Sequence, residues 1–160
     1  SLLIIFSSSM ELKSLKDTKN FSKKISKIIK RGDTIFLFGE IGTGKTTFVR
    51  YLINHLEVEN RIKKSDVLSP TFNIVYDYIV NKTKIQHYDL YRLKNYNDIL
   101  ELGMFEDYTD YIKLIEWPEL IKKKPKDRIE IFFKYSKSMK SRKANIVGFG
   151  KWKNYKFNEF

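Results

Sequence analysis

The sequence predicts an α/β domain with a mainly parallel sheet, flanked by helices and carrying some antiparallel additions. Short apolar runs typical of buried parallel strands alternate with amphipathic helical segments along the chain. A glycine-rich segment, residues 39–47, joins one such strand to one such helix. The sequence shows no internal repeat and no long low-complexity linker. We therefore expect a single domain over residues 10–160.

The first half of the chain predicts two helices around one buried strand. Asp17-Thr18 can cap a helix that runs to about residue 30, because apolar residues recur there at helical spacing. The continuous apolar run at residues 34–38 predicts a parallel strand. Residues 45–56 follow as a second helix with one apolar face.

The second half predicts mostly strands. These strands are short and rich in β-branched or aromatic residues, and they cover residues 73–80, 84–89, 112–116, 128–135, 144–149 and 152–157. The first two flank a three-residue turn, which predicts a β-hairpin. Helical turns are expected over residues 96–102 and 105–111, and Pro118 can open another short helix.

Composition excludes several classes of protein. With 42% hydrophobic and 15% aromatic residues in 160, the chain can form a core and is not expected to be disordered. The absence of cysteine rules out a disulfide scaffold, and two histidines make a zinc site unexpected. The apolar run at residues 2–6 is too short for a signal peptide or a spanning helix, so we expect a soluble, cytoplasmic protein. Residues 1–9 are expected to be an upstream or non-native extension.

The net charge of +12 is unevenly distributed. Residues 122–160, the β-rich C-terminal part, hold 13 basic and 3 acidic residues. A basic end can attract a polyanion such as RNA, but lysine is also simply a frequent surface residue in this chain. The same part contains aromatic residues that could stack on bases or pack within strands, namely Tyr135, Phe149, Trp152, Tyr155 and Phe157.

The segment GEIGTGKT, residues 39–46, carries the strongest functional signal. It satisfies the pattern G-x-x-x-x-G-K-[ST] between an apolar strand and an amphipathic helix, which is the context of a phosphate-binding P-loop. Its glycines let backbone N–H groups surround a phosphate, and the following helix adds its positive end. Lys45 can reach the β- and γ-phosphates, and the Thr46 hydroxyl can ligate Mg²⁺. We therefore predict a P-loop NTPase-like fold with a nucleoside-triphosphate site.

Three further positions are candidates on pattern alone. Asp89 ends a predicted strand, where a carboxylate for Mg²⁺ is expected, although that strand is unusually polar. Glu116 closes the strand at residues 112–116, where it could hold the metal, orient a water or belong to the N-cap region of the next helix. Thr71, in the turn at residues 69–72, could sense the γ-phosphate or form an ST-turn.

Five segments occur in an order and spacing that carry a resemblance: GEIGTGKTTFVRYL, SPTFNIVYDY, HYDLYRL, LGMFEDY and IKLIEWPEL. Together they resemble the TsaE (YjeE) family, the small P-loop ATPases of bacterial tRNA threonylcarbamoyladenosine synthesis, over about residues 17–120. The resemblance implies binding of ATP or ADP and Mg²⁺, with weak hydrolysis. It also implies a role beside the TsaB and TsaD subunits, which place threonylcarbamoyl on adenosine 37 of tRNA.

The resemblance also implies roles for individual residues. The expected nucleotide-binding set is Gly39, Gly42, Thr43, Gly44, Lys45, Thr46, Thr47, Thr18 and Trp117. The expected catalytic set is Lys45, Thr71, Asp89 and Glu116, and the expected metal ligands are Thr46, Asp89 and Glu116. A helix cap is the alternative role for Thr18, and packing beside the nucleotide is the alternative for Trp117. His87 is interpreted as a structural residue.

Two other classes of function stay open. A stand-alone small-molecule kinase would use the same loop, but it usually has a lid with several arginines. Arg92 is the only arginine between Arg61 and Arg128, which speaks against such a lid in this span. An RNA-binding P-loop module would depend on the basic C-terminal part, by direct contact with tRNA, and its affinity would fall steeply with salt.

Overall fold

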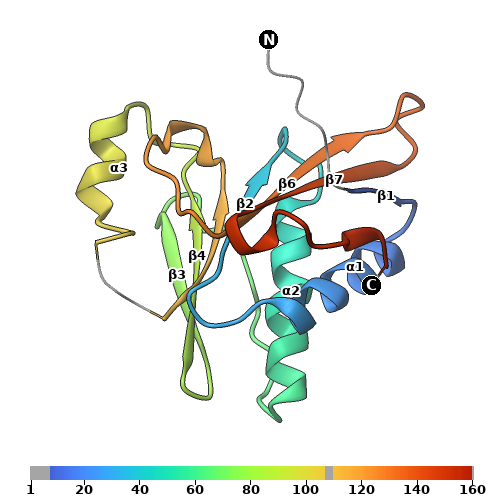
Figure 1. The fold of residues 1–160 in the computed structure, drawn as a ribbon, viewed down its shortest axis with the longest axis horizontal. Helices are drawn as coiled ribbons and strands as arrows, with labels where there is room; N and C mark the ends of the chain where they lie inside the picture. Colours follow the sequence, from blue (N-terminus) through green and yellow to red (C-terminus); the bar gives the residue numbers. More distant parts are fainter. Residues whose placement is uncertain (1–7, 107–109, 160) are drawn as a thin grey trace.

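The computed structural model describes residues 8–106 and 110–159, which contain one seven-stranded sheet (Figure 1). The strands are β1 (Ser8–Leu12), β2 (Thr34–Phe38), β3 (Val75–Val80), β4 (Thr83–Asp89), β5 (Ile112–Glu116), β6 (Arg128–Tyr135) and β7 (Arg142–Phe149). The α-helices in this part of the chain are α1 (Leu15–Ile28), α2 (Lys45–Glu59) and α3 (Tyr96–Leu102). Short 3₁₀ helices are η1 (Pro118–Leu120), η2 (Gly150–Trp152) and η3 (Phe157–Glu159).

The sheet has a parallel centre and antiparallel edges. The strand order is β1-β7-β6-β2-β5-β4-β3. The pairings between β6, β2, β5 and β4 are parallel, whereas β3 at one edge and β7 and β1 at the other are antiparallel. The predicted α/β class with antiparallel additions is confirmed, but the sheet is more evenly mixed than expected. Hairpin connections attach strands at both edges, and such connections require antiparallel pairing.

Both faces of the central strands are covered. Successive side chains of a strand point to opposite faces, so Ile35 and Leu37 pack with α1 and α2 in one apolar cluster. Phe36 lies between them in sequence and packs in a second cluster with Ile99 of α3. Figure 1 shows α3 standing apart from α1 and α2. Within the described residues, no helix is long and apolar enough to cross a membrane.

Helix α1 begins earlier than predicted. Ser14 is its N-cap, and the Ser14 hydroxyl accepts the backbone N–H of Asp17 at 3.3 Å. The Asp17 carboxylate in turn accepts the backbone N–H of Lys13 at 2.8 Å. The prediction of a cap at Asp17-Thr18 is therefore wrong. Asp17 lies in the first helical turn, where an acid interacts well with the free N–H groups.

The predicted strand at residues 152–157 is wrong. Gly150 adopts a φ of +64° after β7, and the chain continues through η2 and η3. The rings of Trp152, Tyr155 and Phe157 pack on one another, with centroids 4.8 to 6.4 Å apart. Trp152 and Phe157 are buried, so neither ring can serve as a platform for a base.

The chain ends also differ in detail from expectation. β1 was not predicted, and it includes Ser8 and Ser9, which pair with β7. β7 begins at Arg142, two residues before the predicted strand. The expected helical turn at residues 105–111 overlaps residues 107–109, which lie outside the described part, as do residues 1–7 of the expected extension. Pro118 opens η1 as predicted.

Replacement of Gly148 should test how closely β7 and η2 pack. A Cβ at Gly148 would overlap the backbone carbonyl of Trp152, so Gly148→Ala should lower the free energy of unfolding by about 1–3 kcal/mol or more. Chemical denaturation would measure this change. Gly32→Ala is the matched control, because its φ is +88° but nothing lies within 4 Å of the added Cβ. It should cost only left-handed strain of about 1–2 kcal/mol. A smaller loss for Gly148→Ala than for Gly32→Ala would contradict the close packing.

Candidate functional site

The register of the parallel strands brings three strand ends together. Glu116, the last residue of β5, is level with Leu37 of β2 on one side and with Asp89, the last residue of β4, on the other. The glycine-rich loop leaves β2 at the same edge and leads into α2. In Figure 1 this loop lies at the top of the molecule, between α3 and the β6–β7 hairpin. Ligands of open α/β sheets bind at this carboxyl edge.

The loop has a backbone that requires glycine. Gly39, Gly42 and Gly44 have φ values of +144°, +80° and +109°. A Cβ at Gly39 would lie 2.6 Å from the carbonyl oxygen of Phe133, so a side chain does not fit. Gly44 is the N-cap of α2 and makes no side-chain capping bond. The first N–H groups of α2 and the positive end of its dipole can therefore bind an anion.

A cavity of about 460 Å³ opens at this loop. The predicted site residues that line it are Gly42, Gly44, Lys45, Thr46, Thr47, Thr71, Asp89, Glu116 and Trp117. The lining residues that were not predicted are Ile41, Ser69, Tyr91 and Arg142. Segments separated by about a hundred positions in the sequence thus line one cavity.

The ammonium group of Lys45 is held at the loop. It donates hydrogen bonds to the carbonyl oxygens of Gly39 and, at 2.9 Å, of Glu40. It also lies 4.3 Å from the ring centroid of Trp117, within range of a cation–π interaction. Burial lowers the pKa of Lys45, while Glu116 foremost and Asp89 next act to raise it. Desolvation therefore lowers the pKa of Lys45 overall, and the nearby acids offset part of this effect.

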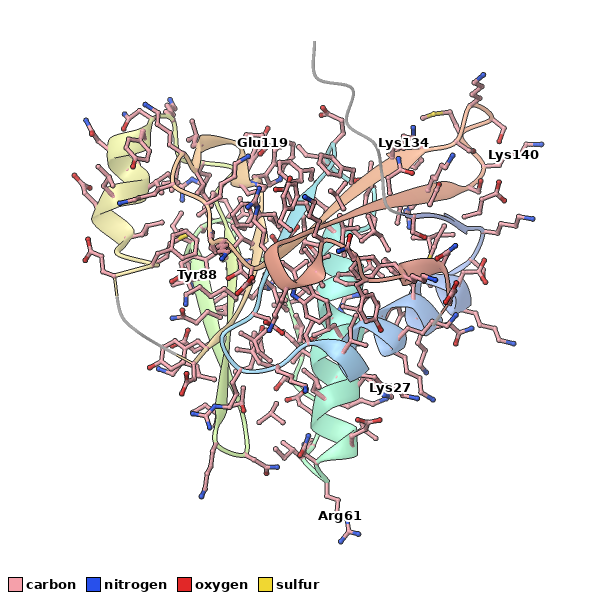
Figure 2. The ribbon with its side chains drawn as sticks, viewed as in Figure 1. Lys27, Arg61, Tyr88, Glu119, Lys134 and Lys140 are labelled. Carbon is pink, nitrogen blue, oxygen red and sulfur yellow. The ribbon has the colours of Figure 1, made fainter. Side chains whose placement is uncertain are left out.

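Trp117 lines the cavity beside Lys45, and Glu119, which does not line it, interacts electrostatically with Lys45. Trp117 has a φ of +56°, a strained value for a bulky residue, and its ring lies 4.8 Å from that of Tyr91. Desolvation raises the pKa of Glu119, and the charge of Lys45 acts in the opposite direction. Figure 2 shows Glu119 at the same upper edge of the molecule as Lys134 and Lys140 of the β6–β7 hairpin.

Glu116 lies in a buried polar network. Its Oε2 is 2.6 Å from Nε2 of His87, and both carboxylate oxygens are 3.0 Å from the Thr46 hydroxyl. An ionised carboxylate only accepts hydrogen bonds, so the His87 ring donates through Nε2. His87 is completely buried, and its Nδ1 has no hydrogen-bond partner among the described residues. The network fixes the carboxylate of Glu116 against the first turn of α2.

Asp89 is held by a second set of donors. Its Oδ2 accepts the hydroxyls of Ser69 at 2.7 Å and Thr71 at 2.9 Å, and its Oδ1 accepts the backbone N–H of Tyr91 at 3.0 Å. The two hydroxyls are 2.9 Å apart. The turn that carries Ser69 and Thr71 is thus tied to the end of β4 through one carboxylate.

These groups fit a metal site that is completed by water and by a bound ligand better than one formed by protein side chains alone. In the part of the chain that the structure describes, no group of three or more His, Cys, Asp or Glu side chains could hold a metal ion. Thr46, Asp89 and Glu116 supply one hydroxyl and two carboxylates. A Mg²⁺ ion usually takes one or two carboxylates and completes its shell with water and phosphate oxygens.

Three predicted residues, Gly39, Thr43 and Thr18, do not line the cavity. The Thr43 hydroxyl donates to the carbonyl of Glu40 at 2.7 Å and so shapes the loop, whereas Gly39 contributes its carbonyl to Lys45. Thr18 is buried in α1, where its carbonyl accepts the hydroxyl of Ser22 at 2.8 Å. Thr18 is not among the residues that line the cavity, and its contact with a nucleotide stays a prediction.

The structure adds site residues that sequence reasoning missed. His87, interpreted as a structural residue, does not line the cavity but contacts Glu116, and it lies two residues before Asp89 on β4, so strand alternation places both side chains on one face. The hydroxyl of Tyr135 donates to the carbonyl of Gly42 at 2.6 Å, and Arg142 lines the cavity. No local pattern marks Tyr135 or Arg142, because both come from the distant β6–β7 hairpin.

Fold and site together define a mixed α/β protein whose candidate site surrounds a glycine-rich loop between a buried strand and a helix. The family model described as "Threonylcarbamoyl adenosine biosynthesis protein TsaE" matches residues 12–144. This chain belongs to the TsaE family.

Individual relatives agree with this membership. A protein of Rickettsia prowazekii named tRNA threonylcarbamoyladenosine biosynthesis protein TsaE is 42% identical over 111 residues, which are 69% of this chain and 74% of the relative. The Bacillus subtilis protein of the same name is 31% identical over 120 residues, 74% of this chain and 72% of the relative. The crystal structure of Bacillus subtilis YdiB has the same fold, with a TM-score of 0.72 at 24% identity, over 95% of this chain and 92% of YdiB.

Removal of the buried histidine should destabilise the protein. Among the described residues, the carboxylate of Glu116 keeps only the Thr46 hydroxyl as a donor in His87→Leu, so we expect the free energy of unfolding to fall by about 2–3 kcal/mol. His55→Leu is the matched control. His55 lies on α2 with its Nε2 3.0 Å from Glu59, a partly exposed pair that contributes about 0.5 kcal/mol. Equal losses in the two variants under chemical denaturation would show that the His87 contact adds nothing.

Proposed function

We propose that this chain is a Mg²⁺-dependent ATP-binding protein and weak ATPase of the P-loop class. It supports threonylcarbamoylation of adenosine 37 in tRNA, together with TsaB and TsaD, in the cytoplasm. Membership of the TsaE family and the names of its relatives support the pathway. The observation that carries the ATP-binding part is the position of Lys45, Thr46 and Glu116 around a loop that requires glycine.

The loop is suited to phosphate. The backbone of Gly42 and Gly44 leaves room for a close approach, and the uncapped N-terminus of α2 offers N–H groups and a positive dipole end. Lys45 adds a desolvated cation, which attracts an anion more strongly than an exposed one would. The cavity of about 460 Å³ falls within the range of small-molecule sites.

Thr46, Asp89 and Glu116 would hold Mg²⁺, directly or through water. When bound, magnesium would neutralise the negative charge of the phosphate oxygens. His87 orients the Glu116 carboxylate, while Ser69 and Thr71 orient that of Asp89. Both carboxylates are thus preorganised before any ligand enters, which is the arrangement that electrostatic catalysis needs.

Hydrolysis in such a site depends on charge and position more than on a nucleophilic side chain. Charge develops on the γ-phosphoryl oxygens as the bond to the leaving group breaks, and Lys45 with the loop N–H groups would stabilise it. Glu116 would orient the attacking water. Thr71 would respond to the γ-phosphate, because its hydroxyl shares the Asp89 carboxylate with Ser69.

The decisive experiment compares ATP hydrolysis by this protein alone and with purified TsaB and TsaD, while tRNA modification is measured in parallel. We expect slow hydrolysis alone and modification that requires both this protein and ATP. Hydrolysis without any effect on tRNA modification would support the proposed nucleotide site and contradict the proposed role in the pathway. Transfer of phosphate to a small-molecule acceptor would instead identify a kinase.

Lys45→Ala should abolish productive ATP binding or turnover, because the variant loses the ammonium group that would bind the phosphates. Calorimetric titration with Mg-ATP and a phosphate-release assay would measure both. Lys27→Ala is the matched control, since Lys27 is exposed on α1 and lies in Figure 2 far from the upper edge of the molecule. Wild-type binding and turnover in Lys45→Ala would disprove the site.

Glu116→Gln should separate hydrolysis from binding. The amide keeps the size of the side chain but loses the charge, so we expect hydrolysis to fall about tenfold or more while ATP affinity changes by about threefold at most. Single-turnover hydrolysis and equilibrium titration would give the two numbers. Equal losses in both would contradict the assignment of Glu116 to water and metal.

A further inference from the structure

Arg142 is the one residue of the cavity wall that comes from the C-terminal hairpin. It is the first residue of β7 and is level with Tyr135 of β6 and with Leu12 of β1, so strands on both sides fix its backbone. A Cβ built at Gly44 would lie 3.6 Å from Cδ and 3.8 Å from Nη1 of Arg142. The guanidinium therefore lies over the N-cap of α2.

Tyr135 couples the same hairpin to the loop. Its hydroxyl donates to the carbonyl of Gly42 at 2.6 Å, and its ring centroid lies 5.7 Å from the guanidinium carbon of Arg142. A tyrosine hydroxyl that donates to a loop carbonyl holds that peptide in place, and the N–H groups of the neighbouring peptides keep their direction. The hairpin thus contributes one cation and one positioning contact to the loop.

The two cations of the cavity lie on opposite sides of the loop. Lys45 faces Trp117, Glu116 and Asp89, on the side of β5 and β4. Arg142 comes from β7, which the sheet order places on the other side of β2. Arg142 also borders a neighbouring cavity of about 250 Å³, next to Leu12 and Ser14. Arg142 therefore lines the cavity from the β7 side of the loop, whereas Glu116 and Asp89 line it from the side of β5 and β4.

We propose that Arg142 is a phosphate-binding residue that neutralises the non-terminal phosphates of the nucleotide, and that Tyr135 is a positioning residue for the loop. This inference rests on the proposed nucleotide site. Thr46 and Glu116 would hold the metal-bound end of a phosphate chain, so its other end would extend toward Arg142, on the other side of the loop. Guanidinium suits this task, because its planar set of donors matches two phosphate oxygens at once.

Arg142→Gln tests the proposal with little change in packing, because the variant keeps a long polar side chain but loses the charge. We expect the dissociation constants of Mg-ATP and Mg-ADP, measured by calorimetric titration, both to rise about tenfold. The dissociation constants of Arg142→Lys should lie between those of Arg142→Gln and the wild type. The difference in dissociation constant between Arg142→Gln and the wild type should shrink at high salt. Lys143→Gln is the matched control, since Lys143 is the next residue of β7 and does not line the cavity.

The outcomes separate this inference from the site on which it rests. If Lys45→Ala loses ATP binding but Arg142→Gln binds both nucleotides like Lys143→Gln, the role of Arg142 is refuted and the nucleotide site survives. If ATP affinity falls and ADP affinity does not, the placement at the non-terminal phosphates is refuted. Tyr135→Phe should weaken the binding of ATP and of ADP about threefold to tenfold, because the contact with the Gly42 carbonyl is lost. Unchanged binding would refute the positioning role of Tyr135.

Discussion

The site depends above all on the register of three parallel strands. Glu116 is level with Leu37 and Asp89, so one edge of the sheet carries the start of the glycine-rich loop and two carboxylates. A shift of β5 by one residue would turn Glu116 to the opposite face of the sheet, away from Thr46 and His87. The apolar residues of β5 oppose such a shift, since Leu114 and Ile115 pack in different clusters on the two faces. Core packing therefore sets the position of the polar groups.

Each buried carboxylate has its own set of hydrogen-bond donors. His87 and Thr46 contact Glu116, while Ser69, Thr71 and a backbone N–H contact Asp89. Both acids are therefore hydrogen-bonded, and Lys45 stays beside them at the carbonyls of the loop. Such a network holds its geometry because the loss of a donor would leave a buried carboxylate with an unmet hydrogen bond. The rigidity of the site follows from this requirement.

Sequence patterns located most of the fold, because the central strands are continuous apolar runs with sharp ends. Residues 34–38, 112–116 and 128–135 form strands with the predicted bounds. The edge strand β1 and the C-terminal segment were harder to predict from the sequence. β1 has only alternate buried residues, and the aromatic residues near the C-terminus form a packed cluster that alternation cannot distinguish from a strand. The glycine-rich loop and the acids at the strand ends were visible as motifs, whereas Tyr135 and Arg142 were not. Their proximity to the loop is a property of the sheet order.

The contact between Tyr135 and Gly42 joins positions that are 93 residues apart. A ribosome releases the glycine-rich loop first, and β6, which pairs with β2, and the hairpin that touches the loop follow only after most of these 93 residues. A nascent chain would thus carry β2 with one open edge, a surface that favours pairing with other chains. The loop would meanwhile lack the tyrosine contact that holds it. The complete loop should therefore form only after β6 and the β6–β7 hairpin have been made, together with the pairing of β6 to β2.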